Sequence, residues 1–406
     1  MSMGNYKRLG DYIQEVNVRN VDLKAQALLG INIDKFFMPS VANIVGTDMS
    51  AYKLVKKNHF ACNRMHVGRD YRLPISMSKS DDEFMVSPAY DVFEIKDTEI
   101  LTPEYLMMWF SRREYDRNAW FYTDADVRGG LHWNAFCDMQ LPIPSPTKQR
   151  ELVKEYNVIL NRIALNNQLI QKLEETAQTI YKQWFVDFEF PDEGGKPYKS
   201  SGGSMTECEL AEIPKGWESL KLGKLVQTQY GFTASADFKN IGPKLLRITD
   251  ISQSQINWEG VPHCKVPQKE LDKYLLNYGD IVIARTGATA GYSKRINKHH
   301  PKAVFASYLV RMIALDKIMN IYLGITIDST KYREFILANA EGSAQPQANA
   351  ILMSEFPILR PMNEVIIKWN RCIEPVIDQI EISQIQNTKL NQFAGLLLSK
   401  LATIEN

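Results

Sequence analysis

The sequence predicts a mixed α/β (α+β) protein in which two tandem globular domains alternate with two long coiled-coil helices. The first observation is a duplication, because short motifs recur in the same order at an offset of about 215 residues. The second is a heptad pattern that follows each copy. The matched stretches are 9–10 with 222–223, 92–95 with 310–313, 105–106 with 322–323, 129–130 with 342–343, and 141–144 with 356–359. We therefore expect a pseudo-twofold molecule, which suits a target with two halves such as DNA.

The composition bounds the classes of protein that remain possible. A chain of 406 residues is too long for one compact core and is typical of two domains with helical spacers. Hydrophobic residues make up 45% and charged residues 23% of the chain, which excludes a wholly disordered protein. The 48 Lys and Arg residues almost cancel the 47 Asp and Glu residues. Any nucleic-acid surface must therefore come from local clustering of cations.

The cysteines and the apolar runs predict the compartment. The five cysteines are scattered, and none has the CxxC or Cys/His spacing of a zinc site. We therefore expect free thiols in a reducing environment. The N-terminus lacks an apolar signal core, and no run approaches the ~20 apolar residues that cross a bilayer. These observations predict a cytoplasmic protein with no membrane contact.

Turn residues divide the chain into five parts. Residues 84–95 are rich in β-formers and residues 103–117 have a helical pattern, and three prolines between 142 and 146 then end the first domain. A segment rich in Gly, Ser, Lys and Pro follows the first helix and predicts a linker or exposed loop. In the second domain the clearest strand is 280–284. The expected parts are a first domain at 1–146, a first helix at 147–190, a linker at 191–212, a second domain at 213–361 and a second helix at 362–406.

Both helices have apolar residues at strict a and d spacing over more than four heptads, which is typical of a coiled coil. The first series is Leu152, Tyr156, Ile159, Ile163, Asn166, Ile170, Leu173, Ala177, Ile180 and Trp184. The second series is Ile366, Trp369, Ile373, Val376, Ile380, Ser383, Asn387, Leu390, Ala394, Leu397 and Leu401.

We expect the two helices to pair in antiparallel fashion and to be roughly 60 Å long each. An ordinary core helix in each domain is the alternative. Asn166, Ser383 and Asn387 are polar a or d residues, which set the register of a coiled coil at some cost in stability. Pro375 lies inside the second series and predicts a kink or a restart there.

No catalytic constellation is recognisable, and we expect neither catalytic nor metal-ligating residues. Residues 87–90 (SPAY) only echo a methyltransferase motif, because the amide or carboxylate that would accept a bond from the base amine is missing. Asp192, Glu193 and Lys196 are residue types that a nuclease uses, but they lie in the predicted linker, which cannot hold ligands rigidly. There is no phosphate-binding GxxxxGK[ST] loop and no HExxH motif. These absences favour a binding protein.

Candidate DNA contacts are local clusters of cations and amides. Lys and Arg on loops suit phosphates, while Arg, Gln and Asn suit base edges; a solvated charged surface is the alternative for each cluster. In the first domain the candidates are Lys53, Lys56, Lys57, Arg64, Arg69, Arg72, Arg128, His132 and Trp133. In the second they are Arg285, Thr286, Lys294, Arg295, Lys298, His299, Gln345, Gln347 and Asn349.

Several stretches together resemble the specificity subunits of type I restriction–modification enzymes. They are IPKGW at 213–217, 245–251, GDIVIARTGATAG at 279–291, GSAQP at 342–346, the spacer-like 188–203, GRDY at 68–71 and SPAY at 87–90. The resemblance covers essentially the full length of the chain. A motif that a family shares cannot encode the private specificity of one member, so Arg285 and Thr286 are expected to brace the fold or to touch phosphate.

The resemblance implies two target-recognition domains, each reading one half of a bipartite asymmetric site in double-stranded DNA. It also implies that the helices act as a ruler and as the docking surface for two methyltransferase subunits, which restriction/translocase subunits then join. S-adenosylmethionine, ATP and Mg²⁺ would belong to those partners, with none bound by this chain. A self-contained DNA modification enzyme and a coiled-coil scaffold for proteins remain as alternatives.

Overall fold

The structure, a computed structural model, describes residues 6–41, 46–65, 67–123, 129–208, 212–252, 255–340 and 347–404. It divides into two compact units, each made of a globular part and half of each long helix. Unit 1 comprises residues 1–166 and 386–406, and unit 2 comprises residues 167–385. Both units mix helices and strands, as the sequence predicts.

A four-stranded antiparallel sheet is the centre of unit 1. Its strand order is β2-β9-β6-β7, with β2 at Ile13–Glu15, β9 at Asp91–Ile95, β6 at Phe60–Cys62 and β7 at Ile75–Met77. Three two-stranded ladders join β1 (Tyr6–Arg8) to β10 (Gln140–Pro142), β5 (Lys53–Val55) to β8 (Phe84–Val86), and β3 (Leu29–Ile31) to β4 (Phe37–Pro39). The short helices are α1 (Val67–Asp70), α2 (Pro103–Phe110), α3 (Arg113–Phe121) and α4 (Trp133–Asp138). The predicted helical stretch 103–117 is thus two helices, which break at Ser111 and Arg112.

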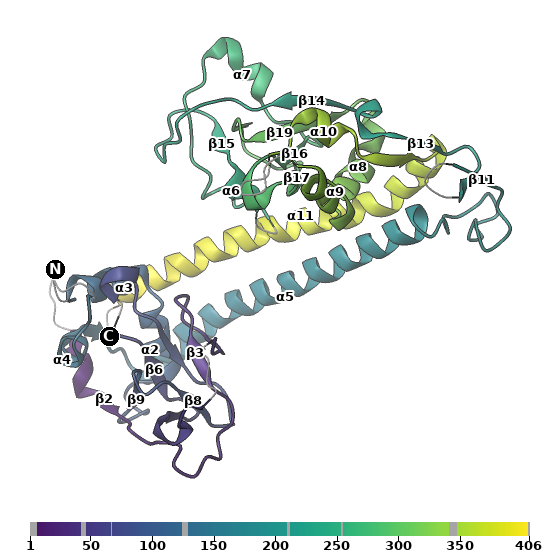
Figure 1. Cartoon of the computed structure of the whole chain (residues 1–406). Helices are drawn as coiled ribbons and strands as arrows, with labels where there is room; N and C mark the ends of the chain where they lie inside the picture. Colours follow the sequence, from purple (N-terminus) through teal and green to yellow (C-terminus); the bar gives the residue numbers. More distant parts are fainter. Residues whose placement is uncertain are drawn as a thin grey trace. The chain divides into compact units, whose positions relative to one another are not determined.

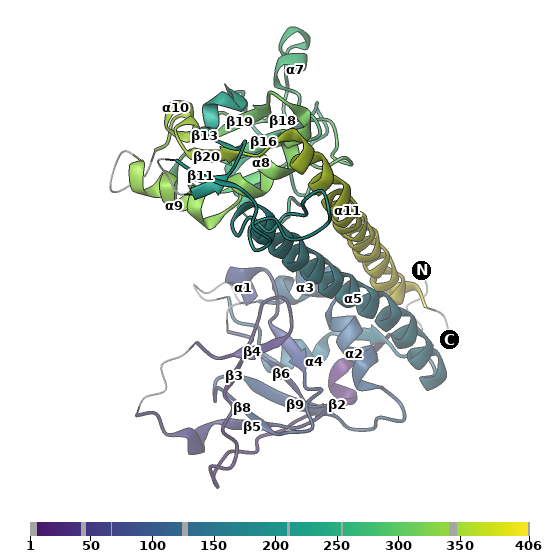
Figure 2. The same cartoon turned by 90° about the vertical axis from the view of Figure 1, so that its right-hand side faces the viewer.

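Aromatic side chains fill the core of unit 1. Phe60 stacks on Phe93 across β6 and β9, with ring centroids 5.1 Å apart. Phe110 and Phe136 close over this pair from α2 and α4, and all four rings are buried. In Figure 2, α2 lies between the sheet and the first half of α5 (Pro146–Phe185). The core therefore joins the sheet to the long helix.

Unit 2 repeats this plan with different sequences. Its four-stranded sheet has the order β14-β19-β16-β17, from β14 (Val226–Tyr230), β19 (Leu309–Ala314), β16 (Ile281–Ala284) and β17 (Ser293–Arg295). Further ladders join β13 (Glu218–Lys221) to β20 (Pro357–Arg360), β11 (Met205–Glu207) to β12 (Glu212–Pro214), and β15 (Lys244–Leu246) to β18 (Ala303–Phe305). Its short helices are α6 (Ile248–Ile251), α7 (Gln268–Tyr274), α8 (Asn320–Ile327), α9 (Thr330–Asn339) and α10 (Ala350–Ser354). Six 3-10 turns complete the elements of the described chain: η1 (Leu9–Asp11), η2 (Met49–Ala51), η3 (Leu222–Lys224), η4 (Gly287–Thr289), η5 (Lys317–Met319) and η6 (Leu401–Thr403).

The ladders show which residues of the two copies are equivalent, and they correct the alignment made from sequence. The Tyr105 hydroxyl donates to the carbonyl of Pro142, and the Tyr322 hydroxyl donates to that of Leu359, 37 residues later in both cases. Residues 139–142 are therefore equivalent to 356–359. The sequence alignment had instead paired 141–144 with 356–359, an error of two residues. Likewise, the pairing of β2 with β9 and of β14 with β19 makes residues 92–95 equivalent to 311–314. The sequence alignment had paired 92–95 with 310–313, so it is wrong by one residue here. The predicted duplication is confirmed, but the residue-by-residue alignment of the two copies was wrong at these strands.

The two long helices, α5 and α11 (Asn363–Lys400), are each continuous (Figure 1). In both helices all residues at the predicted a and d positions are buried or partly buried. Within unit 1 the helices are antiparallel, since Asn166 contacts Asn387 while Leu152 and Leu401 share the core at the other end of these segments. Pro375 is inside α11 without interrupting it, so the predicted restart does not occur. Among the described helices, none is long and apolar enough to cross a membrane.

The segment after α5 is more ordered than a flexible linker. Phe188 and Phe190 are buried against Trp217, and Tyr198 stacks on Phe190 at 4.6 Å. Strand β11 then pairs with β12. Apolar residues among the Gly and Ser of this segment therefore attach it to the core of unit 2.

Candidate nucleic-acid interface

The cations predicted in unit 1 mostly face acidic neighbours. The exposed ion pairs are Lys56–Glu83 at 3.2 Å, Lys57–Asp81 at 2.6 Å, Arg69–Asp70 at 2.7 Å and Arg72–Asp34 at 2.7 Å. Exposed pairs of this kind contribute little to stability. Their cations can exchange a carboxylate for a phosphate at small cost, so these residues remain candidates.

The structure corrects the prediction that Lys53 contacts DNA. It belongs to β5, is only 7% exposed, and its ammonium donates to the carbonyl of Tyr90 at 2.7 Å. All three residues of β5 are buried. Lys53 therefore binds its own domain and is not available to a ligand.

Arg64 also binds groups of its own domain. Its Nε donates to Asp91 Oδ2 at 2.6 Å, and its Nη1 donates to the carbonyl of Leu131. The guanidinium lies over the ring of Trp133, 5.6 Å from the centroid. Trp133 in turn packs on Phe93 and Phe136. Arg64 and Trp133 thus join the end of β6 to the start of α4.

Two of the cations predicted in unit 2 pair with carboxylates of the long helix α11. Arg295 is 3.7 Å from Glu381, and both side chains are nearly inaccessible. Lys298 donates to Asp378 at 2.7 Å, and Lys294 is 3.8 Å from Asp328. Burial raises the pKa of the Glu381 carboxyl above its ordinary value. Arg295 therefore helps to hold the sheet against the helix, and this corrects the prediction for Arg295. Lys294 and Lys298 pair with carboxylates that are partly open to solvent, so both lysines remain candidates.

Two of the remaining predicted residues lie at helix starts. His132 and Asn349 occupy the equivalent N-cap positions of α4 and α10, and the Asn349 side chain accepts from the backbone N–H of Leu352 at 2.8 Å. Thr286 pairs with the exposed Gln347 in an isolated bridge. His299 is exposed. Arg128 and Gln345 lie outside the described residues.

Two features were missed from the sequence. The first is an aromatic surface in unit 1, where Tyr71 is 62% and Phe121 is 76% exposed. Tyr71 packs against the half-exposed Trp120 at 5.3 Å and has a positive φ of 57°, which is strained for a tyrosine. Three consecutive aromatic residues (Trp, Phe and Tyr) at the end of a polar helix could have predicted this surface from the sequence. Exposed aromatic clusters are typical of binding surfaces.

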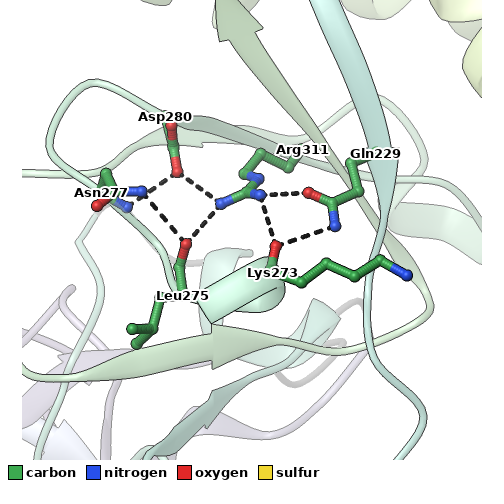
Figure 3. Close-up of polar contacts among 6 residues, drawn as sticks. All are labelled: Gln229, Lys273, Leu275, Asn277, Asp280 and Arg311. Carbon is green, nitrogen blue, oxygen red and sulfur yellow. Dashed lines mark hydrogen bonds and ion pairs between the residues drawn. The ribbon is translucent and has the colours of Figure 1, made fainter. Parts of the chain in front are cut away.

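The second missed feature is a buried cation in unit 2 (Figure 3). Arg311 on β19 donates to Asp280 at 3.1 Å, and both side chains are 6% exposed. The same guanidinium donates to the carbonyls of Leu275 at 2.6 Å and Lys273 at 3.0 Å, and to the side chain of Gln229. It thereby attaches the end of α7 to the sheet. In unit 1 the buried Val92 occupies the equivalent position, so nothing in the first copy predicted this network.

No group of three or more His, Cys, Asp or Glu side chains that could hold a metal occurs within the described ranges. None of the five cysteines forms a disulfide, as the sequence predicts.

The chain is similar in sequence to curated specificity subunits. The HindI specificity subunit of Haemophilus influenzae is 22% identical over 444 aligned positions, covering 91% of each chain. The MjaIX specificity subunit of Methanocaldococcus jannaschii is 22% identical over 284, covering 68% of this chain and 64% of its own. No protein-family model matches. These curated homologues are type I restriction enzyme specificity subunits.

A solved structure agrees in fold. The crystal structure of the type I restriction–modification S subunit from M. genitalium superposes with a TM-score of 0.56 over 100% of this chain and 99% of that chain, at 9% identity. The similarity to type I specificity subunits thus extends over the whole length, including both globular parts and both long helices. The family resemblance that the motifs indicated is confirmed.

Proposed function

We propose that this chain is the non-catalytic DNA-recognition subunit of a type I restriction–modification complex. Each globular part would read one half of a bipartite, asymmetric site in double-stranded DNA. The observation that carries the proposal is the similarity to type I specificity subunits over 91% of the chain. The repeated sheet order supports two readers, and the different strands and loops between the repeated anchors support two different half-sites.

Partner subunits would supply the chemistry. Two methyltransferase subunits would dock on the paired helices and the adjoining faces, and restriction/translocase subunits would join them. S-adenosylmethionine, ATP and Mg²⁺ would be held by these partners. The exposed apolar residues of the long helices, such as Val158 and Phe393, support a protein partner there, because an isolated helix pair would turn polar residues to solvent.

The long helices would act as the spacer between the half-sites. Both helices are continuous through the boundary between the two units, and a continuous helix transmits a change of length as a fixed displacement of about 1.5 Å per residue. Heptad insertions in both helices should therefore change the gap between the half-sites and leave the bases of each half-site unchanged. A fixed gap with altered bases would contradict the spacer role.

The decisive experiment is co-expression with the cognate methyltransferase subunit, followed by genome-wide mapping of methylated adenines. A bipartite motif that disappears when this chain is omitted is the expected result. Methyl transfer by the isolated chain would instead establish a self-contained modification enzyme. A complex that assembles but neither binds nor modifies DNA would establish a protein scaffold.

A further inference from the structure

We infer that Arg285 binds a DNA backbone phosphate, whereas Arg64, its counterpart in the other copy, is an internal brace. The inference rests on the proposed function and adds a specific anion contact, together with a functional difference between two equivalent arginines. The evidence for it is the difference in hydrogen-bond partners between the two guanidinium groups.

The strand ladders establish that the two arginines are equivalent. Cys62 pairs with Asp91 across β6 and β9, and Ile283 pairs with Val310 across β16 and β19. Each arginine comes two residues after the β6 or β16 member of its pair. In both units the arginine carbonyl also accepts from the loop before the short helix, from Leu131 N–H at 3.0 Å and from Ala348 N–H at 2.8 Å.

The neighbouring residue on the central strand differs in a way that decides the role. In unit 1 it is Asp91, whose carboxylate neutralises Arg64 at 2.6 Å. In unit 2 it is Val310, which is fully buried and carries no charge. Among the residues that the structure describes, no carboxylate pairs with Arg285 and no group accepts a hydrogen bond from its guanidinium. Its buried Nε has no hydrogen-bond partner within this described part of the chain.

The surroundings of Arg285 orient it without neutralising it. Its guanidinium lies over the ring of Tyr230, 5.0 Å from the centroid, and the Tyr230 hydroxyl accepts from Ala350 N–H at 3.0 Å. The backbone N–H of Arg285 donates to the carbonyl of Tyr308, whose side chain is 61% exposed. A partly buried cation that stacks on a fixed ring and has no counter-charge can offer its planar fork to an incoming anion.

A phosphate fits this site better than a base edge. Arg285 is held through its main chain at a position that both copies share, so its location does not depend on the segments that differ between them. A contact in that position suits the part of DNA that is the same in every sequence. The arginine fork donates two parallel bonds to phosphate oxygens.

The test measures how salt affects DNA binding by the complete methyltransferase complex, containing full-length variants of this chain. The probe is a 40-base-pair duplex of random sequence, so that no half-site needs to be known. Each neutralised phosphate contributes about 0.9 to the slope of log K against log salt concentration. Arg285→Ala should lower the slope by about that amount and weaken binding about tenfold, the loss of one charge-assisted bond. Arg285→Lys should retain most of the slope.

Arg64→Ala is the matched control. It should leave the slope unchanged and lower the melting temperature of the complex, whereas Arg285→Ala should leave the melting temperature unchanged. If Arg64→Ala fails to fold, Arg64→Lys serves the same comparison. An unchanged slope in Arg285→Ala, or a loss of methyltransferase assembly with an unchanged slope, would overturn the inference. A wild-type complex that does not bind the duplex at all would instead overturn the proposed function.

Discussion

Asn166 of α5 donates a hydrogen bond through Nδ2 to Oδ1 of Asn387 on α11, at 2.9 Å. Both residues are polar members of heptad series that are apolar apart from them and Ser383, and Asn166 is only 1% exposed. A second bond runs from Asn166 to Gln386 at 3.3 Å. Because a slip by one turn would leave these amides unpaired in an apolar seam, the bond specifies which residues of the two helices face each other.

The first prediction concerns this pair. Asn166→Leu combined with Asn387→Leu should raise the melting temperature of the chain, because a buried polar pair is replaced by apolar contact. The same variant should lose unique register, which cysteine cross-linking at positions flanking the pair would detect as several products. Ile163→Ala, one turn away, is the control and should lower the melting temperature by creating a cavity. A double variant that cross-links as uniquely as the wild type would remove the register role.

The second prediction concerns the network of Figure 3. Arg311→Met should destabilise unit 2 by about 3–5 kcal/mol, because Asp280 is left charged and buried without its partner. Adding Asp280→Asn should restore part of the loss, since the uncompensated charge is then removed. Denaturant unfolding measures both values. If the single and double variants were equally unstable, the ion pair would matter less than the bonds from Arg311 to the α7 carbonyls.

The third prediction concerns the contact of two glycines in unit 1. A Cβ added to Gly68 would lie 2.6 Å from the Gly129 Cα, and the Gly68 N–H donates to the Gly129 carbonyl at 2.8 Å. Gly68→Ala should therefore force the two segments apart and lower the melting temperature. Gly130→Ala is a matched control, because its Cβ would meet nothing within 4 Å. Equal melting temperatures for the two variants would show that the loop yields without cost.

The fourth prediction is a pH dependence from Glu381. Burial raises its pKa in the folded state above the ordinary value, so the folded chain binds this proton more readily than the unfolded chain. The contribution to stability is therefore present at low pH and is lost as the pH rises through the folded pKa. The melting temperature of the wild type minus that of Glu381→Gln should be larger at pH 5 than at pH 7.5. The opposite trend would show that attraction by Arg295 and Lys298 outweighs burial.

The sequence by itself determined the duplication, the mixed fold, the two coiled-coil helices and the resemblance to type I specificity subunits. Heptads and turn motifs are local patterns, and their physical cause lies within a few residues along the chain. Even the polar seam residues Asn166 and Asn387 were recognisable, because a single amide stands out in an apolar series.

Only the tertiary structure decided the register of the repeat and the role of each cation. Strand ladders and ion pairs join residues far apart in sequence, as Lys298 and Asp378 are at 80 positions' separation. Whether a lysine or arginine faces solvent or a carboxylate therefore depends on the chain's path, which no local pattern encodes. Arg64 and Arg285 show this most clearly. They are equivalent by fold, yet an aspartate on a neighbouring strand neutralises one, and a valine leaves the other without a counter-charge.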